Sequence, residues 1–148
     1  MPGKSTVVRR AAMQNPLAAK DIMQQSVLAA TPRASMRDVA SQLVSNEISG
    51  MPVAADDGRV IGVITEADIV RALLEGKRLE NLTASDVMTG PPITVDQTAS
   101  LEDLMKCLED NRIVRVPVTY DNKLIGIIAR RDIIKAILEP EFIAFGPL

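Results

Sequence analysis

The chain contains two copies of one sequence pattern, and this internal repeat limits its possible folds more than any other feature. Pro52 recurs as Pro117 after 65 residues, and Asp68 recurs as Asp132 after 64 residues, so one residue has been lost between these positions in the second copy. A pattern that recurs at a nearly constant offset indicates one supersecondary unit duplicated in tandem. We therefore expect two half-domains that bury their apolar faces against each other, with a pair of related clefts between them.

Both copies predict the same order of elements, β-α-β-β-α, preceded by a short helical turn. In the first copy we expect a turn at 19–23, strands at 27–30, 50–54 and 60–64, and helices from 36 and over 66–74. In the second copy we expect a turn at 84–88, strands at 93–95, 114–119 and 124–128, and helices from 101 and over 130–138. Apolar residues at i, i+3, i+4 and i+7 support the helices. The expected fold is α+β, with a small mixed sheet in each copy and both helices on one face.

The predicted organisation is an N-terminal arm at 1–17, a first repeat at 18–80, a second repeat at 81–139 and a C-terminal tail at 140–148. Ser35 and Ser100 are expected to cap the helices that follow them, and Ser85 the second short turn. Gly76 is expected to end the last helix of the first repeat. The tail contains two prolines and one glycine, so we expect it to be extended.

Composition excludes several classes of function. The chain has no histidine and a single cysteine, which removes the commonest general base and any cysteine-rich zinc site. Aromatic residues make up 2% and the net charge is −2, which disfavours stacking on nucleic-acid bases and a broad electrostatic grip on DNA or RNA. Cys107 lies at helical spacing with leucines, which favours a buried core position. No apolar run approaches the roughly 20 residues of a membrane span, so we expect a cytoplasmic protein and no membrane partner.

The junction between the second hairpin strand and the last helix is the most informative local motif. It places Thr65 at the start of the helix and Asp68 three residues later. Two interpretations remain open for this pair. Thr65 and Asp68 are suited to capping the helix and stabilising its dipole, which is the simpler interpretation of the pair alone. They are also suited to binding a polar ligand at the helix start.

Taken in order, these motifs resemble those of the cystathionine-β-synthase (CBS) domain, and the tandem pair resembles a Bateman module. The motifs are a D-[IV]-M turn, an [ST]-x-x-D helix start, a P-V strand and a G-x-[IV]-[TS]-x-x-D segment, and they span residues 17–139. The second copy departs from the last motif, because Ala129 stands where the first copy has Thr65. The resemblance implies binding of adenosine-containing ligands (AMP, ADP, ATP or S-adenosylmethionine) in clefts between the two copies. It implies no catalytic cofactor, although Mg²⁺ can accompany the nucleotide.

Carried over residue by residue, the resemblance assigns Thr65 and Asp68 to the ribose, because hydroxyl and carboxylate groups suit a diol. It assigns Arg115 and Arg131 to the phosphates, with Arg112 and Arg130 as outer members, because a guanidinium is permanently charged and has forked donors. The residues implied to line the adenine slot are Val63, Pro92 and Ile93, and Val114 is a further residue expected at the ligand. A solvated surface cluster is the alternative for the arginines.

The second cleft is expected to differ. The residues assigned to it are Leu28, Ile127 and Asp132. Ser49 and Gly50 stand where the other copy has Val114 and Arg115, and Glu66 and Ala67 stand where it has Arg130 and Arg131. We therefore expect a phosphorylated nucleotide to prefer the Asp68 cleft, and the Asp132 cleft to be empty, weak or suited to an uncharged or cationic adenosyl ligand.

The sequence thus predicts a stand-alone regulatory protein, not an enzyme. We expect it to sense cellular energy through an adenosyl ligand, to form a homodimer through exposed apolar helix faces, and to signal to an unidentified partner protein. Two alternatives remain. The basic cluster could serve a nucleic-acid or protein adaptor, and Asp68 or Asp132 could hold a metal for nucleotide hydrolysis.

Overall fold

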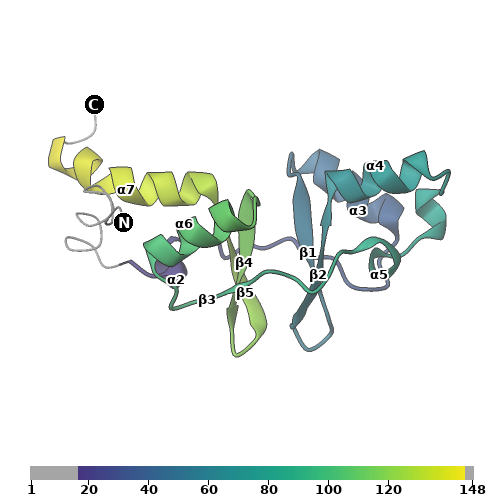
Figure 1. Cartoon of the computed structure of the whole chain (residues 1–148), viewed down its shortest axis with the longest axis horizontal. Coiled ribbons are helices and arrows are strands. Elements are labelled where there is room, and N and C mark those ends of the chain that lie inside the picture. The colour runs from purple at the N-terminus through teal and green to yellow at the C-terminus, as the bar shows by residue number, and fades with distance from the viewer. Residues whose placement is uncertain (1–16, 146–148) are drawn as a thin grey trace. The chain divides into compact units, whose positions relative to one another are not determined.

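The computed structural model describes the backbone of residues 17–145 and the side chains of residues 17–139, so most of the predicted arm and the last three residues lie outside the described part. Figure 1 shows the elements in chain order. They are α2 (Ala19–Ile22), α3 (Met36–Ser45), β1 (Gly50–Ala54), β2 (Val60–Thr65), α4 (Glu66–Leu74), a 3-10 turn η1 (Leu79–Asn81), α5 (Ala84–Val87), β3 (Val95–Asp96), α6 (Leu101–Asp110), β4 (Arg115–Tyr120), β5 (Lys123–Ala129) and α7 (Arg130–Phe145). The predicted α+β fold is confirmed.

The chain forms two compact units, and neither unit is a continuous stretch of sequence. Among the described residues, unit 1 comprises 17–26, 94–120 and 125–145, and unit 2 comprises 27–93 and 121–124. Helix α2 comes from the first repeat but belongs to the unit that holds most of the second repeat. Helix α5 comes from the second repeat and belongs to the unit that holds most of the first. The two repeats therefore exchange their short N-terminal turns.

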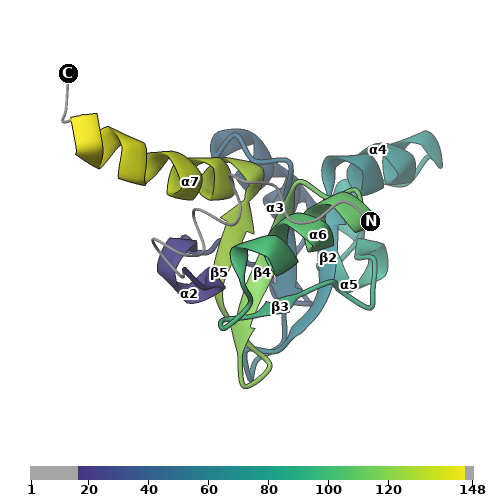
Figure 2. The same cartoon turned by 60° about the vertical axis from the view of Figure 1, so that its left-hand side comes forward.

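Unit 2 is built on the β1–β2 hairpin, which pairs antiparallel from Gly50 with Thr65 to Ala54 with Val60. Helices α3 and α4 contribute side chains to its core, and both lie on the same side of the hairpin in Figures 1 and 2. The core combines residues of α3, β1, β2, α4 and α5: Met36, Val39, Leu43, Met51, Val53, Ile64, Ile69 and Ala84, together with Ala30. This is the helix-on-sheet layering that amphipathic helices impose on a half-buried hairpin.

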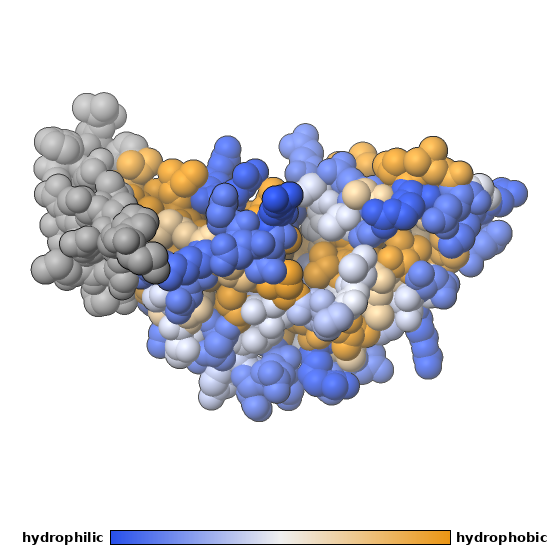
Figure 3. Space-filling model, viewed as in Figure 1, coloured by the Kyte–Doolittle hydropathy of each residue, from blue (hydrophilic) through white to orange (hydrophobic). Residues whose placement is uncertain are grey.

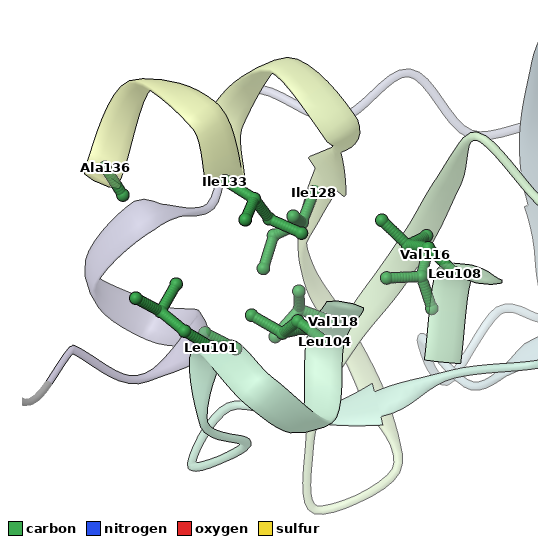
Figure 4. Close-up of a cluster of buried hydrophobic side chains, with 9 residues drawn as sticks. Leu101, Leu104, Leu108, Val116, Val118, Ile128, Ile133 and Ala136 are labelled. Carbon is green, nitrogen blue, oxygen red and sulfur yellow. The ribbon is translucent and has the colours of Figure 1, made fainter. Parts of the chain in front are cut away.

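Unit 1 repeats the arrangement with β4 and β5, to which β3 adds a parallel strand beside β4. Figure 4 shows the core from within. The apolar side chains of α6 and α7 meet those of β4 and β5 there: Leu101, Leu104, Leu108, Val116, Val118, Ile128, Ile133 and Ala136. Each strand presents alternate residues to this core, as the twofold side-chain period of a strand requires.

Two glycines leave room for the exchanged turns to pack against the strands. Gly62 in β2 lies against Met88, which follows α5, and Gly126 in β5 lies against Met23, which follows α2. An added Cβ at Gly62 would lie 2.6 Å from the Met88 sulfur, and one at Gly126 would overlap the Met23 side chain. The close approach predicted for a glycine within a strand is therefore present at the same position in both copies.

Several local predictions are corrected by the structure. The segment predicted as a strand at 27–30 makes one isolated parallel bridge, from Ala30 to Val53. The strand predicted at 93–95 is the two-residue β3, shifted toward the C-terminus. Strand pairing in both segments is short, because only one or two of their residues pair with a strand of the hairpin.

The predicted extended tail is wrong up to Phe145, because α7 continues through Pro140. A proline within a helix removes one backbone hydrogen bond but does not always end the helix. The Ser85 cap is also wrong. The N-cap of α5 is Thr83, whose backbone N–H donates to the Asp86 carboxylate at 2.9 Å.

Other helix starts match their predictions. The Ser35 hydroxyl accepts from the Arg37 N–H at 3.2 Å, and the Ser100 hydroxyl accepts from the Asp103 N–H at 3.1 Å. Gly76 ends α4 with a φ of 78°, a left-handed conformation that favours glycine. Within the described part of the chain, no helix has the length and apolar character needed to cross a bilayer.

Gly62→Ala is expected to destabilise the protein by about 1–3 kcal/mol, because the new methyl group overpacks the Met88 contact. Chemical denaturation measures this change in unfolding free energy. In a Met88→Ala background the same substitution should cost clearly less, since the obstructing side chain is gone. Equal costs in both backgrounds would show that the Met88 contact does not require the glycine.

The cap of α5 predicts a pH effect. The backbone hydrogen bond from Thr83 lowers the pKa of Asp86 below its ordinary value of 3.8. A carboxyl group whose pKa is lowered in the folded state stabilises the fold above its unfolded pKa, and that contribution is lost as the pH falls through the folded pKa. The melting temperature should therefore decrease as the pH is lowered from about 5 to about 3. The melting temperature of the Asp86→Asn variant should decrease less steeply over the same range. Parallel melting curves for the two proteins would argue against this role.

Candidate functional site

Asp68 is the buried polar centre of unit 2, with a relative exposure of 8%. Its Oδ2 accepts from the Thr65 N–H at 2.9 Å and from the Thr65 hydroxyl at 3.0 Å. The Asp68 N–H in turn donates to the Thr65 hydroxyl at 3.4 Å, which completes a capping box at the start of α4. The capping interpretation of this pair is confirmed, and it involves only one of the two carboxylate oxygens.

The second oxygen of Asp68 faces two other side chains. Oδ1 accepts from the Thr89 hydroxyl at 3.2 Å and from Nη1 of Arg71 at 3.1 Å. Thr89 comes from the exchanged segment after α5, and Arg71 lies one turn further along α4. Oδ1 is thus the point where the helix start meets the segment that arrives from the other repeat.

Thr89 was not among the residues predicted for the site. It reaches Asp68 because its backbone pairs with Val63 in β2, with N–H to O distances of 3.0 and 2.9 Å. The sequence does contain a signal for it. Thr89 follows Met88, and Gln24 follows Met23 at the same place in the first copy. A polar residue after each turn methionine could have identified the pair.

Three of the residues predicted for the adenine slot, one from the first repeat and two from the second, lie near this bridge in the sequence. Val63 and Pro92 are half-buried and Ile93 is 37% exposed. The bridge at Val63 and Thr89 brings the start of the segment 89–93 beside β2. Unit 2 therefore holds the predicted ribose pair and these three apolar residues within one compact body.

Unit 1 contains the equivalent arrangement around Asp132. Its Oδ2 accepts from the Ala129 N–H at 2.8 Å, and its Oδ1 accepts from the Gln24 side-chain amide at 3.2 Å. Gln24 pairs with Ile127 through two backbone hydrogen bonds, as Thr89 does with Val63. Leu28, which was assigned to the same site, belongs to unit 2 and is 41% exposed.

The four predicted arginines all belong to unit 1. Arg115 begins β4 and is half-buried, whereas Arg130 and Arg131 are exposed at the start of α7. The Arg130 N–H donates to the Val114 carbonyl at 3.2 Å, which fixes the start of α7 beside the start of β4. Arg112 precedes them in a loop with a φ of 53°. These residues thus cluster along one strand-to-helix junction.

The matching junction in unit 2 confirms the alignment of the copies. The Glu66 N–H donates to the Ser49 carbonyl at 2.9 Å, in the same way as Arg130 donates to Val114. At this junction unit 2 has Glu66 and Ala67 in place of two arginines. The difference in charge between the copies is therefore a difference at structurally equivalent positions.

Cys107 has no feature of a reactive thiol. It is half-buried beside the core of unit 1, and burial raises the pKa of its thiol above the ordinary value. A raised pKa keeps the thiol protonated, and the thiolate is the nucleophilic form. The predicted buried position is corrected to a partly buried one. Among residues 17–139 no three side chains of the histidine, cysteine, aspartate or glutamate types gather to hold a metal ion.

Solved structures with related folds carry adenosyl ligands. CBSX2 in complex with AMP is 27% identical with a TM-score of 0.74, and the match covers 84% of this chain and 98% of that one. The CBS domain pair of protein MJ0100, in complex with 5-methylthioadenosine and S-adenosyl-L-methionine, is 26% identical with a TM-score of 0.72. That match covers 83% of this chain and 97% of that one.

Hypoxic response protein 1 of Mycobacterium tuberculosis is 28% identical over 128 residues, which are 86% of this chain and 90% of that protein. Its structure contains two coordinated zinc ions and matches with a TM-score of 0.74. This chain has no histidine, a common zinc ligand. The CBS domain model matches residues 19–75 and 84–139. This chain therefore belongs to the CBS domain family, with two copies of the domain in tandem.

Proposed function

We propose that this chain is a regulatory protein whose Asp68 carboxylate binds the ribose of an adenosine-containing ligand. The observation that carries the proposal is the duplicated arrangement around Asp68 and Asp132. In each unit a carboxylate at a helix start accepts a hydrogen bond from a polar side chain of the exchanged segment. A ribose diol can join such a junction, because its hydroxyls donate to the carboxylate and accept from a neighbouring hydroxyl or amide.

The surroundings of Asp68 support a nucleoside. Val63, Pro92 and Ile93 give partly exposed apolar surface in the same unit, which suits a purine face. Two relatives are solved in complex with AMP and with 5-methylthioadenosine and S-adenosyl-L-methionine, which supports an adenosine-containing ligand here. Arg115 and Arg131 remain our proposed phosphate ligands. We keep the order inferred from the sequence, in which a nucleotide prefers Asp68 over Asp132.

The proposed role is binding and not catalysis. Asp68 accepts hydrogen bonds from four donors, and a ligand hydroxyl that replaces one of them is held by the carboxylate as a hydrogen-bond donor. A ligand that joins the Thr89–Asp68 contact changes how the exchanged segment is held against α4. Such a ligand shifts the population of unit 2 conformations. An unidentified partner protein responds to the favoured conformation.

Ligand binding is tested best with asparagine variants. Asp68→Ala would remove four side-chain hydrogen bonds, including one half of the α4 capping box, so lost binding could reflect lost folding. Asp68→Asn keeps the shape of the side chain and an oxygen that can still accept from the Thr65 N–H. Asp132→Asn is the matched variant at the equivalent position.

We expect the wild-type protein to bind AMP in calorimetric titrations. Asp68→Asn should lower the affinity for AMP by about tenfold or more, because a hydrogen bond to a charged group contributes about 1.5–3 kcal/mol. Asp132→Asn should change AMP affinity by less than about threefold. Equal losses from the two variants would contradict the preference for Asp68. A wild-type protein that binds none of AMP, ATP and S-adenosylmethionine would contradict the proposed function.

We also propose that two copies associate through the exposed apolar residues of α4. Val70, Leu73 and Leu74 are 54%, 51% and 83% exposed, and Val44 of α3 is 79% exposed. Figure 3 shows apolar atoms at the surface over α4. Large exposed side chains of this kind, gathered on one helix, are typical of an interface.

Leu74→Glu should shift the protein from dimer to monomer in size-exclusion chromatography with light scattering. The fold should tolerate this change because Leu74 is 83% exposed. Asn81→Glu adds the same charge outside the apolar set and should leave the dimer intact. A monomeric wild type, or a Leu74→Glu dimer as stable as the wild type, would contradict the interface.

A further inference from the structure

The Asp68 carboxylate has no vacant acceptor position. A carboxylate offers about four lone-pair sites, and Asp68 meets two donors from Thr65, one from Thr89 and one from Arg71. A ribose hydroxyl that binds Asp68 must therefore displace one of these four. This requirement applies to any diol ligand, whatever its phosphate or sulfonium group.

The four donors differ in how easily they can be displaced. The two Thr65 donors hold Oδ2 at the capping box of α4, and the Thr65 N–H bond is one half of that box, so their loss would open it. Thr89 need not leave, because its hydroxyl can donate to Asp68 and still accept from the ligand. Arg71 has only donors, so a ligand hydroxyl can donate to the lone-pair site that Arg71 occupies on Oδ1 only after Arg71 has left that site.

Arg71 is also well exposed to water. Its side chain is 64% exposed, whereas that of Asp68 is 8% exposed, and their atoms Nη1 and Oδ1 lie 3.1 Å apart. An ion pair with one exposed partner is modest in strength and weakens as salt screens it. Arg71 is thus the group that a ligand displaces from Oδ1.

The second copy has no equivalent competitor. The residue that corresponds to Arg71 is Lys135, whose ammonium lies 3.9 Å from the Glu139 carboxylate. Within the described residues, Asp132 accepts from Ala129 and Gln24 only. Two of its lone-pair sites stay open to a ligand.

We propose that Arg71 is a built-in competitor for the ribose-binding oxygen of Asp68, and that it sets the affinity of this site for diol ligands. This inference rests on the proposed function of Asp68. The ligand exchanges one charge-assisted hydrogen bond for another, and Arg71 turns into solvent. The competitor makes the Asp68 site weaker than its contacts alone would make it, and makes its affinity sensitive to ionic strength.

The test uses adenosine, whose lack of charge removes any direct salt effect on the ligand. All proteins carry Asp132→Asn, so that calorimetric titration reports the Asp68 site. Arg71→Met keeps the apolar stem but removes the competing donor, and adenosine should bind about two- to fivefold more tightly. Lys135→Met removes a cation at the equivalent position and should leave the affinity unchanged.

Salt gives an independent readout. With Arg71 present, adenosine affinity should rise with ionic strength, because screening weakens the pair that the ligand must break. In Arg71→Met this dependence should disappear. A merely structural role for Arg71 would lower the affinity on substitution and would not make the salt response of a neutral ligand vanish.

The outcomes separate the two proposals. Adenosine binding that is unchanged or weaker in Arg71→Met would overturn the competitor while leaving Asp68 as the ribose site. Binding that persists unchanged when Asp68→Asn is added would overturn the ribose site itself, and the competitor with it. No adenosine binding by any of the proteins at millimolar concentration would likewise overturn both.

Discussion

The structure of unit 2 depends on the need to satisfy one buried carboxylate. Burying an ionised group without partners is costly, so Asp68 must be surrounded by donors. Those donors come from three places in the chain: the end of β2, the first turns of α4 and the segment after α5. Asp68 thereby fixes the strand-to-helix junction and holds the segment exchanged from the other repeat. The residue that organises the local fold is the same one that is suited to a ribose.

This double role explains why capping and ligand binding are compatible at Asp68. The carboxylate uses Oδ2 for the helix cap and Oδ1 for Thr89 and Arg71. A ligand can therefore act on Oδ1 without opening the helix. The same division is present at Asp132, where Oδ2 accepts from Ala129 and Oδ1 from Gln24. The copies differ in the groups that donate to Oδ1 and share the hydrogen bond from the backbone N–H at the helix start to Oδ2.

Much of the fold could be predicted because it is set by local rules. The bounds of β1 and α4 match their predictions. The hairpin turn marks the end of β1, and the capping residue Thr65 marks the start of α4. The roles of Thr89 and Arg71 could not be predicted in this way. Thr89 lies 21 residues from Asp68 and reaches it only because the short turns are exchanged between units. The helical tail was missed because the sequence shows a proline but not whether the helix tolerates it.

The most direct measurement is an amide NMR titration of the protein with AMP. The account predicts saturable chemical-shift changes concentrated at residues 63–68 and 89–93, because the ligand enters the contact between Asp68 and Thr89. In Asp68→Asn the changes at 63–68 should require about tenfold more AMP or more to reach the same size. Saturable changes confined to other residues, or no saturable changes at all, would contradict the assignment of Asp68 as the ribose-binding residue.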